Sequence, residues 1–331
     1  ADAITTAKFP DQQLEAFKVQ ASSRFPDQKM SAAERASQEV IAMLCGEGHI
    51  LSKKLQPDAK DLATISAAQL REFHARYYSP ERTTVIITGD IDPAFVNTVL
   101  TEQFGSWKRS QNPASPARVA AASQYKHLII NDSTTANNLA YYRIGLPALA
   151  QNDARFPSLV VLNSILSYGA RSRLRSALWG RHMISPSVTS SIGFSKDCAY
   201  LLISGSTSPD IADSVLLLVA AELEALANNG ITQNELDDIK AELLRDNSLM
   251  FSSNRNVQSL LKEVAVYGGT PAWVFAFSDR LSSLETADVN ALATELFKRG
   301  IERVVVCGNA AKLEKPMSSV LGPVPVVQID K

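Results

Sequence analysis

The chain has 331 residues, 33 basic and 34 acidic side chains, and a formal net charge of −1. Hydrophobic residues make up 45% of it and charged residues 20%, which is typical of a globular protein long enough for two domains. The charge balance excludes a strongly basic nucleic-acid-binding protein and an acidic disordered tail. The longest apolar run, residues 215–221, is far shorter than the ~20 residues of a membrane-spanning helix, so we expect no nucleic-acid partner and no membrane span.

The first clear pattern along the chain is a helix followed by a strand, over residues 66–90. Ser66 and Gln69 form a capping box that begins the helix, and apolar residues follow at spacings of three and four. After a short turn, residues 85–87 are a β-branched run typical of a buried strand, which Gly89 ends.

A run of Ser, Pro, Asn and Ala over residues 110–117 predicts a linker. The segments that we predict beyond it are strands at 127–131, 139–146, 187–194 and 199–204, and a helix at 156–166. Since strands come early in this part of the chain and helices late, the order predicts an α+β fold with a mostly antiparallel or mixed sheet.

Long helices are predicted after residue 207. Ser208 and Pro209 begin one helix, which Gly230 ends. Thr232 and Glu235 form a capping box for the next one. A further helical segment is expected over residues 255–267.

The sequence contains an internal repeat. Residues 67–90 align without a gap with residues 286–309, at an offset of 219 residues. The strand run at 85–87 falls on the apolar run at 304–306, and Thr286 is predicted to cap the second helix. Helix–turn–strand units can also resemble one another by chance, because hydrophobic patterns recur easily.

The repeat predicts two homologous α+β units, of which the first is incomplete. Residues 1–112 would be the second half of a first unit, residues 113–123 a linker, and residues 124–331 a complete second unit. The missing first half would lie before Ala1, where it is cut away, disordered or carried by another polypeptide.

Most motif searches for chemistry give nothing. The sequence has no G-x-S-x-G, P-loop, G-x-G-x-x-G after a strand, H-E-x-x-H or H-x-x-E-H. The three cysteines cannot all pair, and no C-x-x-C indicates a zinc ribbon or a redox pair. Cys45 and His49, close to Glu39 and Glu47, could in principle hold a soft metal, although the glycines around Glu47 favour a turn.

Four features together carry a family resemblance. They are the 219-residue repeat, the tract from Phe73 through Ser79-Pro80 to Val85-Ile86-Ile87-Thr88-Gly89-Asp90, the tract Phe104-Gly105-Ser106-Trp107, and the tract Tyr168-Gly169-Ala170-Arg171-Ser172-Arg173-Leu174. The chain resembles the pitrilysin/insulinase family of zinc metallopeptidases, in particular its short bacterial two-unit members, over nearly its whole length.

The resemblance implies a specific machinery. Two homologous units would enclose unfolded peptides in a chamber, and a helix with H-x-x-E-H in the first unit would bind Zn²⁺ with help from a distal Glu. An Arg and a Tyr seven positions apart in the second unit would stabilise the oxyanion. Zinc is therefore expected for a complete assembly, and none is expected on this chain alone.

The Arg/Tyr positions fall on unsuitable residues. Aligning Ser172-Arg173-Leu174 on one side and Ser187-Val188 on the other places Trp179 and Pro186 at these positions. Neither residue can stabilise an oxyanion as the Arg/Tyr pair does, because indole is a single neutral donor and proline has none. A rival register places Arg175 and His182 there instead, and that pair could still donate hydrogen bonds. We favour the first register because it matches both anchors.

The distal zinc ligand has three candidates in this chain. They are Glu15, on the predicted helical segment 12–19, and Glu34 and Glu39, on the next helix. The sequence does not choose among them, and each can equally be a solvated helix carboxylate.

Two functions are open. The first is a zinc-dependent peptidase, or one subunit of it, that acts on extended peptides and whose metal motif is not in this chain. The second is a non-catalytic homologue that serves as a partner subunit or peptide-binding scaffold. Either protein would form a homo- or hetero-oligomer with a family paralogue. The opening Ala1-Asp2-Ala3 and the bacterial features of the family favour a periplasmic location, and the alternative is a soluble intracellular protein.

Overall fold

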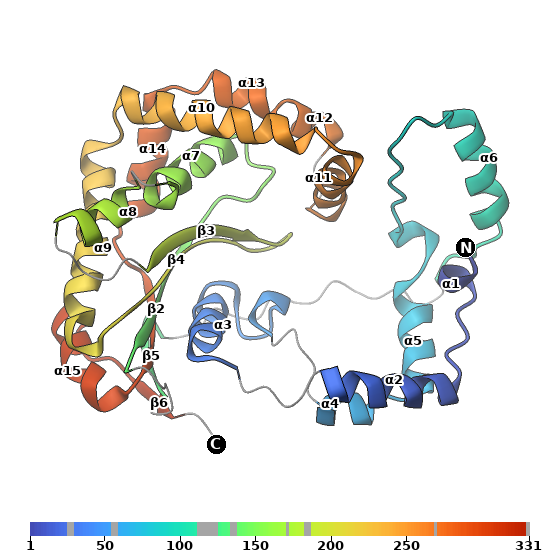
Figure 1. Ribbon diagram of the computed structural model, residues 1–331, viewed down its shortest axis with the longest axis horizontal. Helices are drawn as coiled ribbons and strands as arrows, with labels where there is room; N and C mark the ends of the chain where they lie inside the picture. The colour runs from blue at the N-terminus through green and yellow to red at the C-terminus, as the bar shows by residue number, and fades with distance from the viewer. Residues whose placement is uncertain are drawn as a thin grey trace. The chain divides into compact units, whose positions relative to one another are not determined.

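The protein forms two compact units in the computed structural model, which is shown in Figure 1. The structure describes residues 1–24, 30–53, 59–110, 125–132, 138–169, 172–181, 187–267 and 270–328. Unit 1 comprises residues 1–29, 54–118 and 253–262, and unit 2 comprises residues 30–53, 119–252 and 263–331. Each compact unit is assembled from separate segments of the chain, with residues 30–53 in unit 2 and residues 253–262 in unit 1. The division into repeat units at residues 1–112 and 124–331 stays a prediction. The predicted linker 113–123 lies outside the described residues.

Unit 2 is built on a six-stranded mixed sheet with the strand order β3-β4-β2-β5-β1-β6. The strands are β1 (His127–Asn131), β2 (Ala140–Pro147), β3 (Val188–Phe194), β4 (Ala199–Thr207), β5 (Arg303–Gly308) and β6 (Val326–Gln328). Neighbours from β3 to β5 are antiparallel, whereas β1 is parallel to both β5 and β6. The predicted α+β class with a mixed sheet is confirmed.

Helices cover one face of this sheet and enclose the main hydrophobic core (Figure 1). The helices of this side are α7 (Phe156–Ser167), α9 (Ala212–Asn229), α10 (Gln233–Met250), α13 (Phe277–Ser282), α14 (Thr286–Phe297) and α15 (Ala310–Leu321). Alternate residues of a strand point to opposite faces, so Val304 and Val306 of β5 pack in the main core, while Val305 points to the other face.

Helix α3 (Ala32–Cys45) covers that other face, on the opposite side of the sheet from α9 and α15 (Figure 1). A capping box of Ser31 and Glu34 begins the helix, and Gly46 follows its end. Its apolar stripe packs in a second, smaller cluster with Leu128, Ile130 and other residues of the sheet. The sheet of unit 2 is therefore a buried layer between two apolar surfaces.

The internal repeat is visible in the helices. The helices of the first copy are α2 (Asp11–Arg24), α3, α4 (Ala59–Thr64), α5 (Ala67–Tyr77) and α6 (Pro93–Phe104). Shifted by 219 residues, each begins within three residues of the start of α10, α11 (Asn254–Tyr267), α13, α14 or α15, in that order. The remaining short helical elements are α1 (Asp2–Thr5), Ile50–Ser52, Pro80–Arg82, α8 (Arg173–Arg175), Ser176–Arg181, Pro209–Ile211 and α12 (Pro271–Phe275).

One predicted strand is wrong. Residues 85–87 form no strand, and Val85 is 50% and Ile87 44% exposed, whereas Val304 and Val306 in the second copy are 0% and 1% exposed. The difference has a physical cause: β5 lies between β1 and β2, and no described segment of unit 1 supplies such neighbours. A β-branched run forms a strand only where backbone partners exist.

Three helix starts were predicted in detail, with different outcomes. The capping boxes at Ser66 and Thr232 are confirmed, with both reciprocal hydrogen bonds. The predicted cap at Thr286 is wrong by one residue, because Glu285 is the N-cap and pairs with Asp288. No helix in the described parts of the chain is long and apolar enough to cross a membrane.

Candidate functional site

The positions predicted for the oxyanion pair lie at and after α8. Trp179 lies in a π-helical turn, Ser176–Arg181, and is 49% exposed. Arg175 ends α8 and is also exposed. Pro186 and His182 lie outside the described residues, so both registers of the pair stay predictions. Of the four positions, the structure describes Trp179 and Arg175, which lie one helical turn apart.

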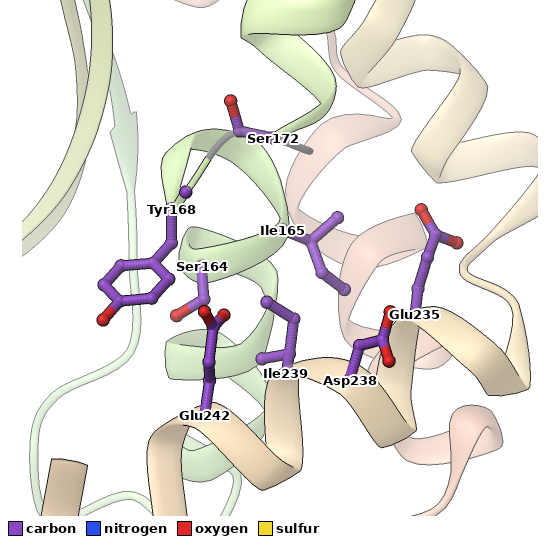
Figure 2. Close-up of a pocket in the computed structure, with 9 residues that line it drawn as sticks. Ser164, Ile165, Tyr168, Ser172, Glu235, Asp238, Ile239 and Glu242 are labelled. Atoms are coloured by element: carbon purple, nitrogen blue, oxygen red, sulfur yellow. The ribbon is translucent and has the colours of Figure 1, made fainter. Parts of the chain in front are cut away.

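A cavity of about 430 Å³ lies beside the glycine-containing tract that precedes α8, between α7 and α10 (Figure 2). Ile165 of α7 and Ile239 of α10 give it an apolar wall. Three carboxylates, Glu235, Asp238 and Glu242, lie along one face of α10 at spacings of three and four residues. The cavity is therefore apolar on one side and acidic along one helix.

An ion pair fixes the acidic end of this cavity. The Arg173 guanidinium donates two hydrogen bonds to Glu235, at 2.7 and 2.9 Å, and lies 3.6 Å from a Glu222 oxygen. Burial raises the pKa of Glu235, but the hydrogen bonds from Arg173 and from the Thr232 backbone outweigh it and lower this pKa to about 2. Glu235 is ionised at neutral pH and cannot serve as a general acid there.

The cavity wall near Tyr168 is polar without being reactive. The Tyr168 hydroxyl donates a 2.7 Å hydrogen bond to Asp246, which raises the pKa of the phenol. No histidine or cysteine belongs to the described lining of the cavity. The residues that line it can hold an apolar or cationic group, but they contain no activated nucleophile.

A Ser, a His and an Asp meet at the turn between β3 and β4, but they do not form a catalytic triad. Nε2 of His49 lies 2.9 Å from Asp197 and 3.2 Å from Ser195 Oγ, so both partners are on the same ring nitrogen. Nδ1 accepts from the Leu51 amide, and the Ser195 hydroxyl donates to Asp197 at 2.8 Å. A triad needs the base to accept the serine proton on one nitrogen while the acid holds the other, so this cluster is structural.

The same turn holds a disulfide that the sequence did not reveal. Cys45, the last residue of α3, is bonded to Cys198, across 153 residues, with a Cα–Cα distance of 5.6 Å. The possibility of a soft-metal site at Cys45 and His49, which the glycines around Glu47 already disfavoured, is therefore excluded, because a half-cystine has no thiolate to offer. Three cysteines with no motif gave no signal for the pair; only the tertiary contact brings it together.

The three alternatives for the distal zinc ligand lie in different surroundings, and the choice among them stays a prediction. Glu15 is exposed on α2 and forms a 2.8 Å ion pair with Lys18. The Glu34 carboxylate accepts the hydrogen bonds of the capping box that begins α3. Glu39 is half-buried on α3, where burial and then the charge of Glu47 raise its pKa. No three His, Cys, Asp or Glu residues among those described are grouped to hold a metal ion, so the residues present do not fit a zinc site.

Comparison with known proteins identifies the family. The family model "Peptidase M16 inactive domain" matches residues 64–243, more than half of the chain. The chain therefore belongs to this metallopeptidase family, as the sequence resemblance predicted, and its own sequence lacks the H-x-x-E-H motif.

Individual relatives agree with this assignment. A Mycobacterium tuberculosis protein named an uncharacterized zinc protease is 24% identical over 83% of this chain and 63% of its own length. A peptidase M16 inactive domain from Pseudomonas fluorescens superposes with a TM-score of 0.76 at 22% identity, covering 92% of this chain and 72% of the other. The first half of the periplasmic protease PqqL from Escherichia coli gives a TM-score of 0.66 at 21% identity, covering 94% and 69%. The chain thus spans about 63% of the length of the curated relative.

Proposed function

We propose that this chain is a non-catalytic member of its family that binds extended peptides by strand addition to the outer edge of β3. The observation that carries the proposal is this edge itself. β3 is the end strand of the sheet, seven residues long, and contains Ser, Thr, Gly and apolar residues but no charge and no proline. Such an edge lacks the features that usually block pairing with another strand.

The hydrogen-bond register shows which groups a peptide would meet. Ser187 accepts from the Ser206 amide and the Ser195 amide donates to Cys198, so odd-numbered residues of β3 face β4. In an antiparallel pair the alternate residues point their N–H and C=O groups away from the partner. The outward groups therefore belong to Val188, Ser190, Ile192 and Phe194, and the Ser190 carbonyl among them already accepts a 3.2 Å hydrogen bond from Ser167 Oγ of α7. Peptide binding by β-augmentation uses such a row of groups.

The non-catalytic part of the proposal rests on residue types. The described residues offer no metal site, and Trp179 stands where an arginine is expected in the favoured register. The rival register keeps Arg175, so a zinc peptidase assembled with a metal-binding partner is the competing function. The names of the relatives, which call them zinc proteases, favour that second candidate for a complete assembly.

We also infer that unit 1 binds a polypeptide that supplies strands, as a family paralogue or another part of a longer protein would do. Exposed Val85 and Ile87 support this, since their counterparts in β5 are covered by a parallel strand on one side and an antiparallel strand on the other. In such an assembly the amides of residues 85–88 would exchange slowly with solvent; equal exchange with and without the partner would contradict it.

The disulfide and the PqqL structure support a periplasmic location. Structural disulfides persist in oxidising compartments such as the bacterial periplasm. Measuring the thiol content of the chain after expression with and without a secretion signal tests this, with the Cys45–Cys198 bond expected only in the exported form.

Peptide binding is tested with two variants of one residue. Ile192→Pro removes an outward N–H from β3, whereas Ile192→Ala removes the side chain and keeps that donor. Fluorescence anisotropy with a labelled, unfolded peptide should show at least tenfold weaker binding for Ile192→Pro than for Ile192→Ala, with both folds checked by circular dichroism. Equal binding by the two variants would exclude the β3 edge.

Catalysis is tested on the purified chain with added zinc. We expect no cleavage of a quenched fluorescent peptide and no bound metal by elemental analysis. Stoichiometric zinc, together with cleavage that a chelator abolishes, would overturn the non-catalytic proposal and support the peptidase.

A further inference from the structure

Helix α3 is held on its face of the sheet by surprisingly little apolar contact. Its buried residues are Ala32, Ala36, Val40, Ala42, Met43 and Cys45, three of them alanines and one the half-cystine itself, and Ile41 and Leu44 pack against the same cluster while staying partly exposed. An alanine side chain removes only one methyl group from water, so this stripe contributes much less than the leucine-rich helices on the other face. Non-covalent packing therefore holds α3 less firmly than it holds the helices of the main core.

A buried cation lies beneath closed α3 and is hydrogen-bonded to it. Arg143 of β2 is only 8% exposed and donates to Ser37 Oγ at 2.7 Å and to the Ala33 carbonyl at 3.1 Å, both on α3. Its other two hydrogen bonds end on the backbone oxygens of Tyr142 and Gly205. All four acceptors are neutral. The hydrogen bonds therefore pair the N–H groups of the guanidinium, but they bring no negative charge to offset the free-energy cost of removing its positive charge from water.

The disulfide between Cys45 and Cys198 connects the end of α3 to the sheet. Cys45 ends α3, and Cys198 lies in the turn that joins β3 to β4. Cys45 is buried, whereas Cys198 is only partly buried, so an attacking thiolate reaches the sulfur of Cys198 first. The His49 contacts with Asp197 and Ser195 add polar bonds at the same turn.

We propose that the Cys45–Cys198 disulfide is a site of thiol–disulfide exchange, a redox latch that keeps α3 closed over the sheet. The reductant is a dithiol. One of its thiolates attacks Sγ of Cys198, and Cys45 leaves as a thiolate and takes a proton. The second thiol of the reductant then resolves the mixed disulfide, so the reductant becomes a disulfide and the protein gains two thiols. Reduction leaves α3 held by the narrow apolar stripe, the two Arg143 hydrogen bonds and the His49 contacts at the turn, and it opens.

The chain contains its own reporter for this opening. Cys307 of β5 is 0% exposed and lies in the cluster that α3 covers. Closed α3 shields its thiol from an alkylating reagent, whereas open α3 exposes it. Labelling of Cys307 therefore distinguishes a moved helix from a disulfide that is simply broken.

The experiment compares the full chain with the double variant Cys45→Ser/Cys198→Ser under native conditions. N-ethylmaleimide should label no cysteine in the oxidised chain, and Cys307 at least tenfold faster in the double variant and in the chain treated with dithiothreitol. Hydrogen exchange should speed up in α3 and stay unchanged in α9 and β5, which separates local opening from global unfolding. Unchanged Cys307 labelling and α3 exchange after reduction would overturn the latch, as would labelling of Cys45 before reduction. Neither readout depends on peptide binding, so the latch can fail while the proposed function stands.

Discussion

At the scale of single residues, one arginine connects several parts of unit 2. Arg173 of α8 contacts Glu222 of α9 and Glu235 at the start of α10, and donates to the Gly230 carbonyl between them. This places the tract that carries the family resemblance against the two long helices. The role of the arginine here is to position helices, since its hydrogen bonds end on Glu235 and on the Gly230 carbonyl and its side chain is not part of the described lining of the cavity.

Replacing Arg173 should therefore reduce stability rather than a chemical step. Arg173→Ala removes the cation that two carboxylates contact in a partly buried place, and we expect a loss of about 2 kcal/mol in the free energy of unfolding. Arg175→Ala on the same short helix is the control, because its exposed side chain should change stability by no more than about 0.5 kcal/mol. Urea denaturation measures both, and equal losses would contradict the role given to Arg173.

The same ion pair predicts a pH dependence. The pKa of Glu235 is about 2 in the folded chain against 4.5 for the free group, so below 4.5 the unfolded chain takes up a proton that the folded chain does not. The stability that Glu235 contributes should be complete above pH 4.5 and decline as the pH falls toward 2. Thermal melts of the natural chain and of Glu235→Gln should converge across that window; a constant difference between them would refute the assignment.

At the scale of elements, the position of α3 depends on a glycine in the strand beneath it. A Cβ on Gly145 of β2 would lie 2.6 Å from Leu44 Cδ1 and 2.8 Å from Val40 Cγ2. Real Cβ atoms do not approach other atoms so closely, and valine has few rotamers to move into. The absence of a side chain at 145 is what lets α3 approach the sheet.

A larger residue at this position should push α3 away from the sheet. Gly145→Val is expected to lower the free energy of unfolding by about 1–3 kcal/mol through overpacking. The change should also increase the labelling rate of Cys307. Ala311→Val, on the exposed side of α15, is the control with an expected loss of about 0.6 kcal/mol. A Gly145→Val protein as stable as the control would mean that α3 does not pack there.

At the scale of the whole molecule, the two units differ in how they are held together. The two hydrophobic clusters found among the described residues both belong to unit 2. Unit 1 instead leaves Phe17, Phe73 and Phe95 more than half exposed. Unit 1 alone therefore has little buried apolar surface to offset the conformational entropy of folding.

Unit 1 should consequently open at lower denaturant than unit 2. Hydrogen exchange of the isolated chain at rising denaturant should show the helical amides of α5 (Ala67–Tyr77) exchanging at least 100-fold faster than those of α14 (Thr286–Phe297), the matching helix of the repeat. Peptide-resolved mass spectrometry makes the comparison within one molecule. Similar protection at the two places would show that unit 1 is as cooperatively folded as unit 2.

The helices of both units were largely predictable from the sequence because their signals are local. Capping boxes at Ser66 and Thr232, the glycine stop at 230 and the periodicity of α9 act over a few residues, and each is present in the structure. The family was predictable too, because its tracts are short and contiguous. The candidate cavity was not, since its two walls come from helices about 70 residues apart in the sequence.

The sequence by itself determined the family, the fold class and most helices, and it indicated that the metal motif is absent from this chain. Only the tertiary structure decided which β-branched segments pair as strands, on which face of the sheet α3 packs, and which two cysteines form the disulfide. The reason is physical: a helix closes its hydrogen bonds within itself, whereas a strand, a disulfide and a covering helix each need a partner that folding brings from elsewhere. Residues 85–87 and 304–306 carry the same pattern, and only the second run has neighbours to pair with.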